Sequence, residues 1–222
     1  MRLLATKILS ENLKIRLLHH GFSVVEYPFI HVIPLNVKVE KIHEHVIFTS
    51  QNAVRLAYDN HTLQPLLANK KFHCVGEKTA AMLIEKGGNV LSKAANAKAL
   101  GQYLSTHFKT DSFSFLCGQM RMSDLENQFK IESRMKDFEV IEVYHTELQP
   151  KTIEGHFNGI LFYSPSAVKS FFLKNRVPES VHCFCIGPTT AKSLVDKNTP
   201  YSVAKTADDS QMLLMIKNFY SA

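Results

Sequence analysis

One pattern occurs twice in the chain, as VIFTSQNAVRL at residues 46–56 and as ILFYSPSAVKS at residues 160–170. Aligned without gaps, the two stretches share a phenylalanine, a serine and an Ala-Val pair. In both, a short apolar run ends at a hydroxyl residue, and a segment with helical spacing follows at once. Short apolar strands that alternate with longer periodic segments are typical of parallel sheets covered by helices. The repeated stretch therefore predicts an α/β fold.

The repeat extends beyond these two stretches. After them, CVGEKTAAML (74–83) matches CIGPTTAKSL (185–194), and a weaker match pairs LSKAANAKALGQYL (91–104) with VAKTADDSQMLLMI (203–216). Looser matches pair RLLATK (2–7) with SFLCGQ (114–119) and GFSVVEYP (21–28) with DFEVIEVY (137–144). The offsets are close to half of the 222 residues. Taken alone, the repeat indicates two successive α/β domains.

Each half is expected to alternate strands with helices. In the first half, the expected strands are 2–6, 22–27, 45–49, 71–75 and 89–91, and the expected helices are 10–20, 51–59, 77–86 and 96–107. Gly21 and Gly87 follow two of these helices, where a helix C-cap would lie. Asn52 and Ser166 are the expected N-caps of the helices in the repeated stretch, and Pro165 suits a helix start.

The charge of the chain favours an anionic ligand. The net charge is +6 and the isoelectric point is about 9.1, a balance that suits nucleic acid, a phosphate or a polycarboxylate. The basic residues are scattered, with no run longer than Lys70-Lys71, whereas a nucleic-acid footprint usually clusters its charges. A small anionic ligand is therefore expected rather than nucleic acid.

The sequence predicts neither a membrane segment nor a metal site. No apolar run approaches the roughly 18 residues that span a bilayer, and charges from Arg2 onward interrupt any signal-peptide core. Four cysteines, Cys74, Cys117, Cys183 and Cys185, lie in or beside apolar runs and are expected to be buried in a reducing compartment. The Cys183/Cys185 pair could contribute to a metal site, but no second pair stands at a zinc-like spacing. We therefore expect a cytoplasmic protein.

Several helix starts are expected at the carboxyl ends of strands, where ligands bind in open parallel sheets. Free N–H groups and the helix dipole suit carboxylates or phosphates there. The motifs VGEKTA (75–80) and IGPTTA (186–191) repeat an arrangement of strand, glycine turn, hydroxyl residue and helix. The candidate contacts are Ser50, Asn52, Thr79, Ser164, Ser166 and Thr190. Simple helix capping is the alternative explanation for each of them.

Tyr144 stands outside the repeat. It ends the apolar strand FEVIEVY (138–144), and its counterpart in the first half lies near Pro28. A tyrosine that breaks an internal symmetry is a candidate functional group. The alternative is a boundary tyrosine with a packed ring and a hydroxyl in contact with water.

Six motifs together resemble the uroporphyrinogen-III synthase family. They are FTSQNAV (48–54), VGEKTA (75–80), FLCGQMRMSDL (115–125), VIEVYHT (140–146), FYSPSAV (162–168) and IGPTTA (186–191). They follow the family's order and spacing over nearly the whole chain, although each is short. The chain departs from the family at Lys7, where relatives usually carry an arginine that can bind a carboxylate through two N–H groups. It also departs around Arg121, where relatives often carry more charge.

The resemblance implies a crossed domain arrangement in place of two successive domains. The family has two flavodoxin-like lobes, each a parallel sheet flanked by helices, joined by a two-stranded β-ladder. By this resemblance, the first lobe combines residues 1–34 with 155–222, the second holds 45–140, and the connecting ladder comprises 35–44 and 141–154. Two thin connectors would act as a hinge.

The resemblance also implies a reaction. Hydroxymethylbilane, a linear tetrapyrrole with eight carboxylates, loses its terminal hydroxyl as water, and the azafulvene cation closes through a spiro intermediate that inverts ring D. No metal or organic cofactor is implied, and the enzyme acts mainly by positioning the substrate. Tyr144 is implied as the group that assists loss of the hydroxyl. The resemblance adds Lys7 and Arg121 as ionic contacts to the carboxylates, and the expected enzyme is a monomer.

Two other function classes stay open at this point. A non-catalytic, two-lobed anion-binding or sensor protein would share the fold, the hinge and the charge. A nucleic-acid-binding protein is suggested only by the isoelectric point, and it would bind arbitrary DNA with a steep salt dependence. The sequence contains no GxGxxG, GxxxxGK(S/T) or GxSxG motif, so neither nucleotide binding nor serine hydrolysis is indicated.

Overall fold

The structure is a computed structural model in which residues 1–221 are described. The chain divides into two compact units. The first comprises Met1–His31 together with the chain from Glu147 onward, and the second comprises Val32–Thr146. The two successive domains that the repeat alone indicated are therefore wrong, because the first unit takes its elements from both ends of the chain.

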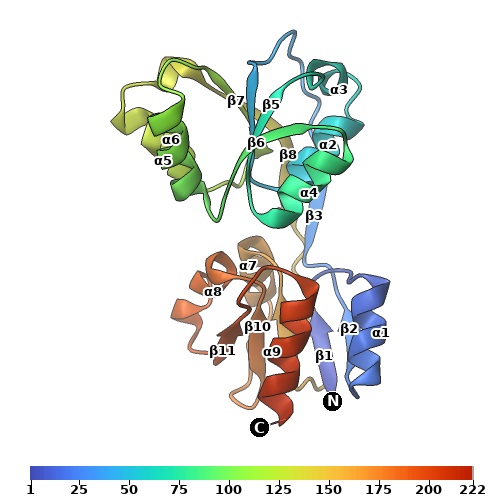
Figure 1. Ribbon diagram of the computed structural model, residues 1–222. Coiled ribbons are helices and arrows are strands. Elements are labelled where there is room, and N and C mark those ends of the chain that lie inside the picture. Colours follow the sequence, from blue (N-terminus) through green and yellow to red (C-terminus); the bar gives the residue numbers. More distant parts are fainter. Residues whose placement is uncertain (222) are drawn as a thin grey trace. The chain divides into compact units, whose positions relative to one another are not determined.

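The first unit is a five-stranded parallel sheet with helices on both faces (Figure 1). Its strands are β1 (Arg2–Ala5), β2 (Ser23–Glu26), β9 (Gly159–Phe162), β10 (His182–Cys185) and β11 (Tyr201–Val203), in the order β11-β10-β9-β1-β2. Its helices are α1 (Glu11–His19), α7 (Pro165–Phe172), α8 (Pro188–Lys192), the 3-10 turn η2 (Val195–Lys197) and α9 (Asp209–Ser221). One buried cluster, with Phe162 and Phe171, packs beneath α7 and α8. Another, with Leu13 and Ile216, packs beneath α1 and α9.

The second unit is built around a six-stranded sheet. Its strands are β3 (Ile30–Pro34), β4 (His45–Phe48), β5 (Lys71–Val75), β6 (Asn89–Ala94), β7 (Phe113–Gly118) and β8 (Phe138–Leu148), in the order β3-β8-β7-β4-β5-β6. Its helices are α2 (Gln51–Asp59), α3 (Leu63–Leu66), α4 (Glu77–Glu85), α5 (Ala97–His107), α6 (Asp124–Ile131) and the 3-10 turn η1 (Met135–Asp137). The strands from β4 to β8 pair in parallel. Strands β3 and β8 both run across the boundary between the two units.

The two sheets share one strand order. The first runs β2-β1-β9-β10-β11, and the second contains β8-β7-β4-β5-β6. Both correspond to the flavodoxin-like order 2-1-3-4-5. In the second unit, β4 comes first along the chain among these five strands, but it occupies the place of the third strand. Strands that the sequence repeat aligned, β4 with β9 and β5 with β10, occupy the same places in the two sheets. The predicted class, α/β with parallel sheets flanked by helices, is confirmed.

Most local predictions for the first half of the chain agree with the observed elements. The helix at 51–59 and the strand at 71–75 have the predicted bounds, whereas the strand predicted at 89–91 continues to Ala94 and the short α3 was not expected. Gly21 and Gly87 directly follow the C-caps of α1 and α4, and both have a φ of +78°. Glycine adopts this left-handed conformation at little cost.

The N-caps of α2 and α7 differ from the prediction. Ser50 and Ser164 are the caps, not Asn52 and Ser166. Ser50 Oγ accepts the N–H of Asn52, and Ser164 Oγ accepts the N–H of Ala167, both at 3.1 Å. The backbone is still extended at both serines, which makes them the last residues before the helix, as an N-cap requires.

Candidate active site

The carboxyl ends of β4 and β7 lie at the level of Tyr144 in the second sheet, whereas β8 itself continues to Leu148, beyond the strand end at Tyr144 that the sequence predicted. Phe48 of β4 pairs with Leu116 of β7, and two residues further along β7, Gly118 pairs with Tyr144 of β8. Ser50 likewise lies two residues beyond Phe48, the last residue of β4. Ser50, Gly118 and Tyr144 therefore lie side by side across three neighbouring strands.

Tyr144 and Ser50 are hydrogen-bonded at this level. The Tyr144 hydroxyl donates to Ser50 Oγ at 3.3 Å, and the same oxygen accepts the N–H that caps α2. Burial raises the pKa of the Tyr144 phenol, and the hydrogen bond with Ser50 offsets only part of this rise. A phenol with a raised pKa is protonated at neutral pH. The arrangement therefore presents Tyr144 as a hydrogen-bond or proton donor.

Arg121, in the loop after β7, is paired with two glutamates. Its Nε donates to Glu126 Oε1 at 2.8 Å, and its Nη1 donates to Glu142 Oε1 at 2.7 Å. Glu126 lies in the first turn of α6, and Glu142 precedes Tyr144 by two residues on β8. The guanidinium thus fastens the loop to α6 and β8. A ligand carboxylate would have to share it with both glutamates.

The start of α4 is a second helix N-terminus at the same edge of the sheet. Gly76 is its N-cap, with a φ of +85°. Thr79 lies in the first turn and is only 4% exposed, so its hydroxyl does not face solvent. Asn52, in the first turn of α2, is half-buried. An anion at either helix start would therefore be bound mainly by backbone N–H groups.

In the first unit, the strand ends carry Lys7, Ser164 and Thr190. The Lys7 ammonium lies 4.8 Å from the centroid of the Tyr163 ring. The hydroxyl of Tyr163 is buried without a hydrogen-bond partner in the described structure, and burial raises its pKa. Thr190 is buried, and Ser166 lies in the first turn of α7 behind the capping Ser164. Tyr163 was not singled out from the sequence, although it lies inside the repeated motif FYSPSAV.

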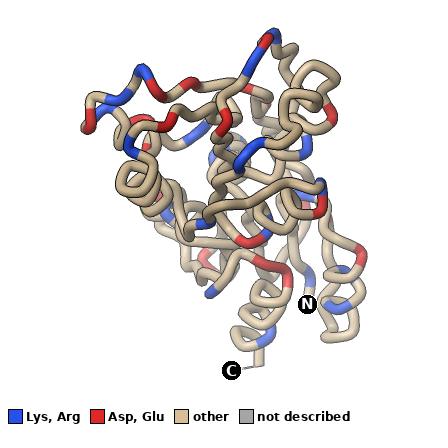
Figure 2. Tube along the Cα trace, turned by 45° about the horizontal axis from the view of Figure 1, so that its top comes forward, with Lys and Arg blue, Asp and Glu red and all other residues tan. Residues whose placement is uncertain are grey.

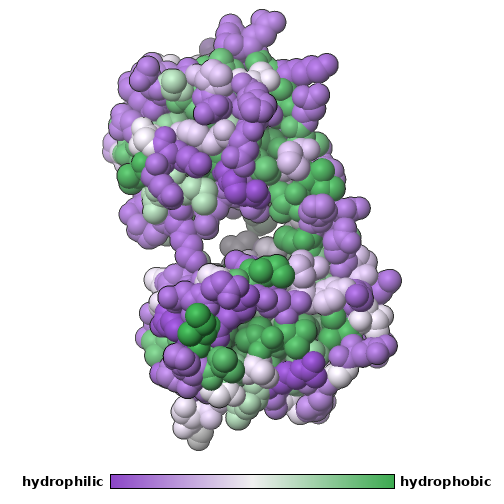
Figure 3. Space-filling view, turned by 90° about the vertical axis from the view of Figure 1, so that its right-hand side faces the viewer, coloured by the Kyte–Doolittle hydropathy of each residue, from purple (hydrophilic) through white to green (hydrophobic). Residues whose placement is uncertain are grey.

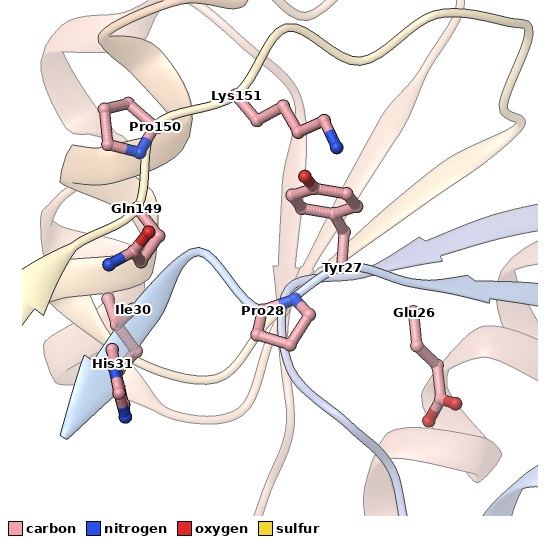
Figure 4. Close-up of a pocket in the computed structure, with 8 residues that line it drawn as sticks. All are labelled: Glu26, Tyr27, Pro28, Ile30, His31, Gln149, Pro150 and Lys151. Carbon is pink, nitrogen blue, oxygen red and sulfur yellow. The ribbon is translucent and has the colours of Figure 1, made fainter.

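A pocket of about 580 Å³ opens in the first unit beside the end of β2 (Figure 4). Its lining residues are Glu26, Tyr27, Pro28, Ile30, His31, Gln149, Pro150 and Lys151. Lys151 Nζ lies 4.7 Å from the centroid of the Tyr27 ring, a contact that orders the side chain and leaves its charge at the pocket. Gln149, Pro150 and Lys151 lie in the predicted connector 141–154, whereas the other lining residues lie in the predicted first lobe. The position of Tyr27 at the end of a strand was the signal that could have pointed to the pocket.

The candidate residues fall into two sets. The second unit holds Ser50, Asn52, Thr79, Arg121 and Tyr144, and the first holds Lys7, Ser164, Ser166 and Thr190. Lysine and arginine are spread along the trace among aspartate and glutamate, without one dominant basic cluster (Figure 2). This distribution agrees with the scatter of basic residues in the sequence.

The described residues hold no cluster of three or more histidine, cysteine or acidic side chains that could bind a metal ion. Cys183 and Cys185 are buried free thiols, and burial raises the pKa of Cys183 to about 11 and that of Cys185 to about 12. Both thiols are therefore protonated at neutral pH. Within residues 1–221, no helix has the length and apolar character that crossing a membrane requires.

Comparison with known proteins gives one family. The chain matches the family model described as Uroporphyrinogen-III synthase HemD over residues 11–213. Among solved structures, uroporphyrinogen-III synthetase from Helicobacter pylori is similar, with a TM-score of 0.71 and 19% identity over 99% of this chain and 100% of that one. A mutant uroporphyrinogen III synthase from Thermus thermophilus has a TM-score of 0.69 and 18% identity over 100% of this chain and 99% of that one. At these sequence identities, the two solved structures show that this chain shares their fold. None of the curated proteins compared with the chain matches it.

Proposed function

Because the chain belongs to the uroporphyrinogen-III synthase family, we propose that Tyr144 assists the loss of the hydroxyl group from its substrate, hydroxymethylbilane. The enzyme is a cyclising hydro-lyase of heme biosynthesis. It closes the linear tetrapyrrole into uroporphyrinogen III, with loss of water and inversion of ring D. The observation that carries the proposal is the Tyr144–Ser50 hydrogen bond at the carboxyl edge of the second sheet.

The proposed step uses Tyr144 as a donor. Its hydroxyl hydrogen-bonds to the terminal hydroxyl of the substrate, and the proton passes to that oxygen as the C–O bond breaks. Water leaves, and an azafulvene cation remains. The substituted α-carbon of ring D attacks this cation and forms the spiro intermediate. The bond between that carbon and the methylene that joined ring D to ring C then breaks, and the resulting azafulvene cation on ring C is attacked by the other α-carbon of ring D. The proton that this carbon loses as ring D regains aromaticity returns to the tyrosinate. The raised pKa of the phenol supports this role, because the group is protonated before each turnover.

We propose that the substrate carboxylates are bound chiefly by helix starts in the two units. The positions are Ser50, Asn52 and Thr79 in the second unit and Ser164, Ser166 and Thr190 in the first. Backbone N–H groups make most of these contacts, because Thr79 and Thr190 are buried and Ser50 and Ser164 already cap helices. Lys7 and Arg121 add ionic contacts, with Arg121 shared with its two glutamates. Eight carboxylates distribute the binding energy, so any single change among these contacts should cost little.

The domain organisation that we propose has a first lobe of residues 1–34 with 155–222, a second lobe of 45–140, and connectors at 35–44 and 141–154. The division into two compact units, one of them discontinuous, supports this organisation. The family's two thin connectors would let the lobes move as separate bodies.

We further propose that the enzyme is a monomer in the cytoplasm and has no nucleic-acid partner. Four buried free thiols suit a reducing compartment, and the spread of basic residues offers no concentrated footprint for nucleic acid. Figure 3 shows apolar side chains among polar ones on the side of the first unit that carries α1, where Ile15 and Leu18 are exposed. Sedimentation over a hundredfold concentration range would reveal a dimer that uses such a surface.

The test of function is the isomer that the protein makes. Incubated with freshly prepared hydroxymethylbilane, the protein should give uroporphyrinogen III, whereas a non-catalytic anion-binding protein would give only the non-inverted ring of the uncatalysed reaction. Tyr144→Phe removes the donor but keeps the ring, so it should fold normally and lower kcat by about a hundredfold. Unchanged turnover in this variant would exclude Tyr144 from the mechanism.

A further inference from the structure

We propose that Gly118 is a positioning residue, and that its missing side chain allows the Tyr144 ring to lie across β7 and bring its hydroxyl to Ser50. The inference rests on the proposed role of Tyr144. It adds a residue that does not touch the substrate but sets where the proton donor stands.

One side chain spans three strands at this edge of the sheet. Strands β8, β7 and β4 are neighbours in that order, so β7 separates Tyr144 of β8 from β4, which leads into Ser50. Adjacent strands lie about 4.8 Å apart. The ring of Tyr144 must therefore pass over β7 to reach Ser50, and the residue of β7 at that level is Gly118.

A β-bulge sets the level of Tyr144. Cys117 of β7 pairs with Glu142, but the next residue, Gly118, pairs with Tyr144, so the register skips Val143. Paired residues of neighbouring strands point to the same face of a sheet. The bulge thus places the Tyr144 side chain on the face where a side chain at position 118 would stand.

The space over Gly118 is filled by the tyrosine ring. A Cβ at this position would lie 2.5 Å from both Cε2 and Cζ of Tyr144 and 2.8 Å from its hydroxyl oxygen. Non-bonded carbon atoms normally stand about 3.5–4.0 Å apart, so a methyl group would force the ring away. The backbone does not require glycine here, because Gly118 is not among the glycines with positive φ. Room for the ring is the feature that calls for glycine.

The first test is a double-mutant cycle on turnover. Gly118→Ala should lower kcat by about the same factor as Tyr144→Phe and change KM little, because it moves the donor and removes no substrate contact. Gly118→Ala in the Tyr144→Phe background should be no slower than Tyr144→Phe alone. Gly101→Ala is the matched control, since it adds a methyl group in α5 against the flexible side chain of Gln128, at 3.2 Å. It should keep the kcat of the unaltered enzyme.

The second test separates the steric contact from the chemistry. Gly118→Ala should lower Tm in the unaltered enzyme and should lower it far less in the Tyr144→Ala background, where no ring opposes the methyl group. If Gly118→Ala alone does not fold, recovery of a folded protein in Gly118→Ala/Tyr144→Ala supports the same contact. Failure of that double variant to fold, while Tyr144→Ala folds, overturns the proposal.

The outcomes also distinguish this proposal from the proposed function. An unchanged kcat in Gly118→Ala, or an equal loss of Tm with and without the ring, overturns the positioning role while the assignment of Tyr144 stands. Unchanged turnover in Tyr144→Phe instead removes Tyr144 from the reaction. In that case the Tm measurements would still test whether Gly118 makes room for the ring, but the glycine would have no part in turnover.

Discussion

Single residues of this enzyme depend on partners that lie far away in the sequence. The family resemblance implies Arg121 as an ionic contact to the substrate, but two glutamates already hold its guanidinium. One of them, Glu142, is 21 residues away. Tyr144 was chosen because it breaks the repeat, and its partner Ser50 is 94 residues away. The repeat and the family resemblance indicate these two residues, but neither indicates the partners, which only the fold brings close.

Two buried histidines form a hydrogen-bonded pair at the amino end of the second sheet. His45 Nδ1 and His73 Nε2 are 2.8 Å apart, and His73 Nδ1 lies 2.7 Å from Ser92 Oγ. Burial lowers the pKa of both rings, and it lowers that of His73 to about 3, with smaller contributions from His45 and Lys71. Asp111 opposes this at His45 without reversing it. Both rings are therefore neutral at pH 7.

The histidine pair should make the enzyme sensitive to acid. In the unfolded chain His73 takes up its proton near pH 6.5, but the folded state resists protonation down to about pH 3. Stability should therefore be complete above about pH 6.5 and fall as the pH drops from there toward 3. His73→Gln cannot take up this proton. Within that window, the unfolding free energy of the variant should therefore fall less steeply with decreasing pH than that of the unaltered enzyme, by up to about 1.4 kcal/mol per pH unit.

Urea unfolding at pH 7.5, 5.5 and 4.5 would measure this difference. His61→Gln, at an exposed position, serves as the control and should keep the pH dependence of the unaltered enzyme. Parallel pH curves for His73→Gln and the unaltered enzyme would show that the buried pair does not govern acid stability.

At the scale of helices and strands, periodicity predicted the elements well because each strand runs directly into its helix. The N-caps of α2 and α7 were predicted wrongly, because SQN (50–52) and SPS (164–166) each contain two residues that suit an N-cap. Pro165 could have resolved the second case, since proline favours the first position of a helix and Ser164 precedes it. The bulge at Val143 has no signal in the sequence, because it depends on how β8 lies against β7.

The cap of α7 should be worth a measurable part of the stability of the first unit. Ser164→Ala removes the oxygen that accepts the Ala167 N–H, and should lower the unfolding free energy by about 1 kcal/mol. Ser166→Ala changes the same residue type within the helix, where alanine is the better helix former, and should cost nothing. Urea unfolding of the two variants would compare them. A larger loss in Ser166→Ala would assign the cap as the sequence alone predicted it.

At the scale of the whole molecule, the repeat revealed the content of each sheet but not how the chain is shared between them. Its halves are similar in sequence, yet each sheet is assembled from parts of both halves. A self-alignment cannot distinguish the two arrangements, because both bury the same apolar strands. The crossed arrangement was implied only by the family resemblance. In the structure it arises because β1 pairs with β9 as well as with β2, which joins the two ends of the chain in one sheet.

The second unit should fold on its own. Its two buried clusters contain only residues between Val37 and Tyr144, whereas those of the first unit combine residues from both ends of the chain. A fragment of residues 30–148, which retains β3 and β8 entire, should give a helix-containing circular dichroism spectrum and a cooperative thermal transition. A fragment of residues 149–222 lacks β1 and β2 and should give neither. The absence of a transition in the first fragment would mean that the two units form one cooperative structure.

The central pairing of β1 with β9 has a consequence for synthesis of the protein on the ribosome. Leu4 pairs with Ile160, and at translation rates of about 5–20 residues per second the partner strand is made roughly 8–30 seconds later. During that interval the nascent chain displays an apolar strand that the finished enzyme buries, with Leu3 and Leu4 at most 1% exposed. The inserted unit can fold in the meantime, while the amino-terminal segment remains a substrate for chaperones until the last third of the polypeptide emerges.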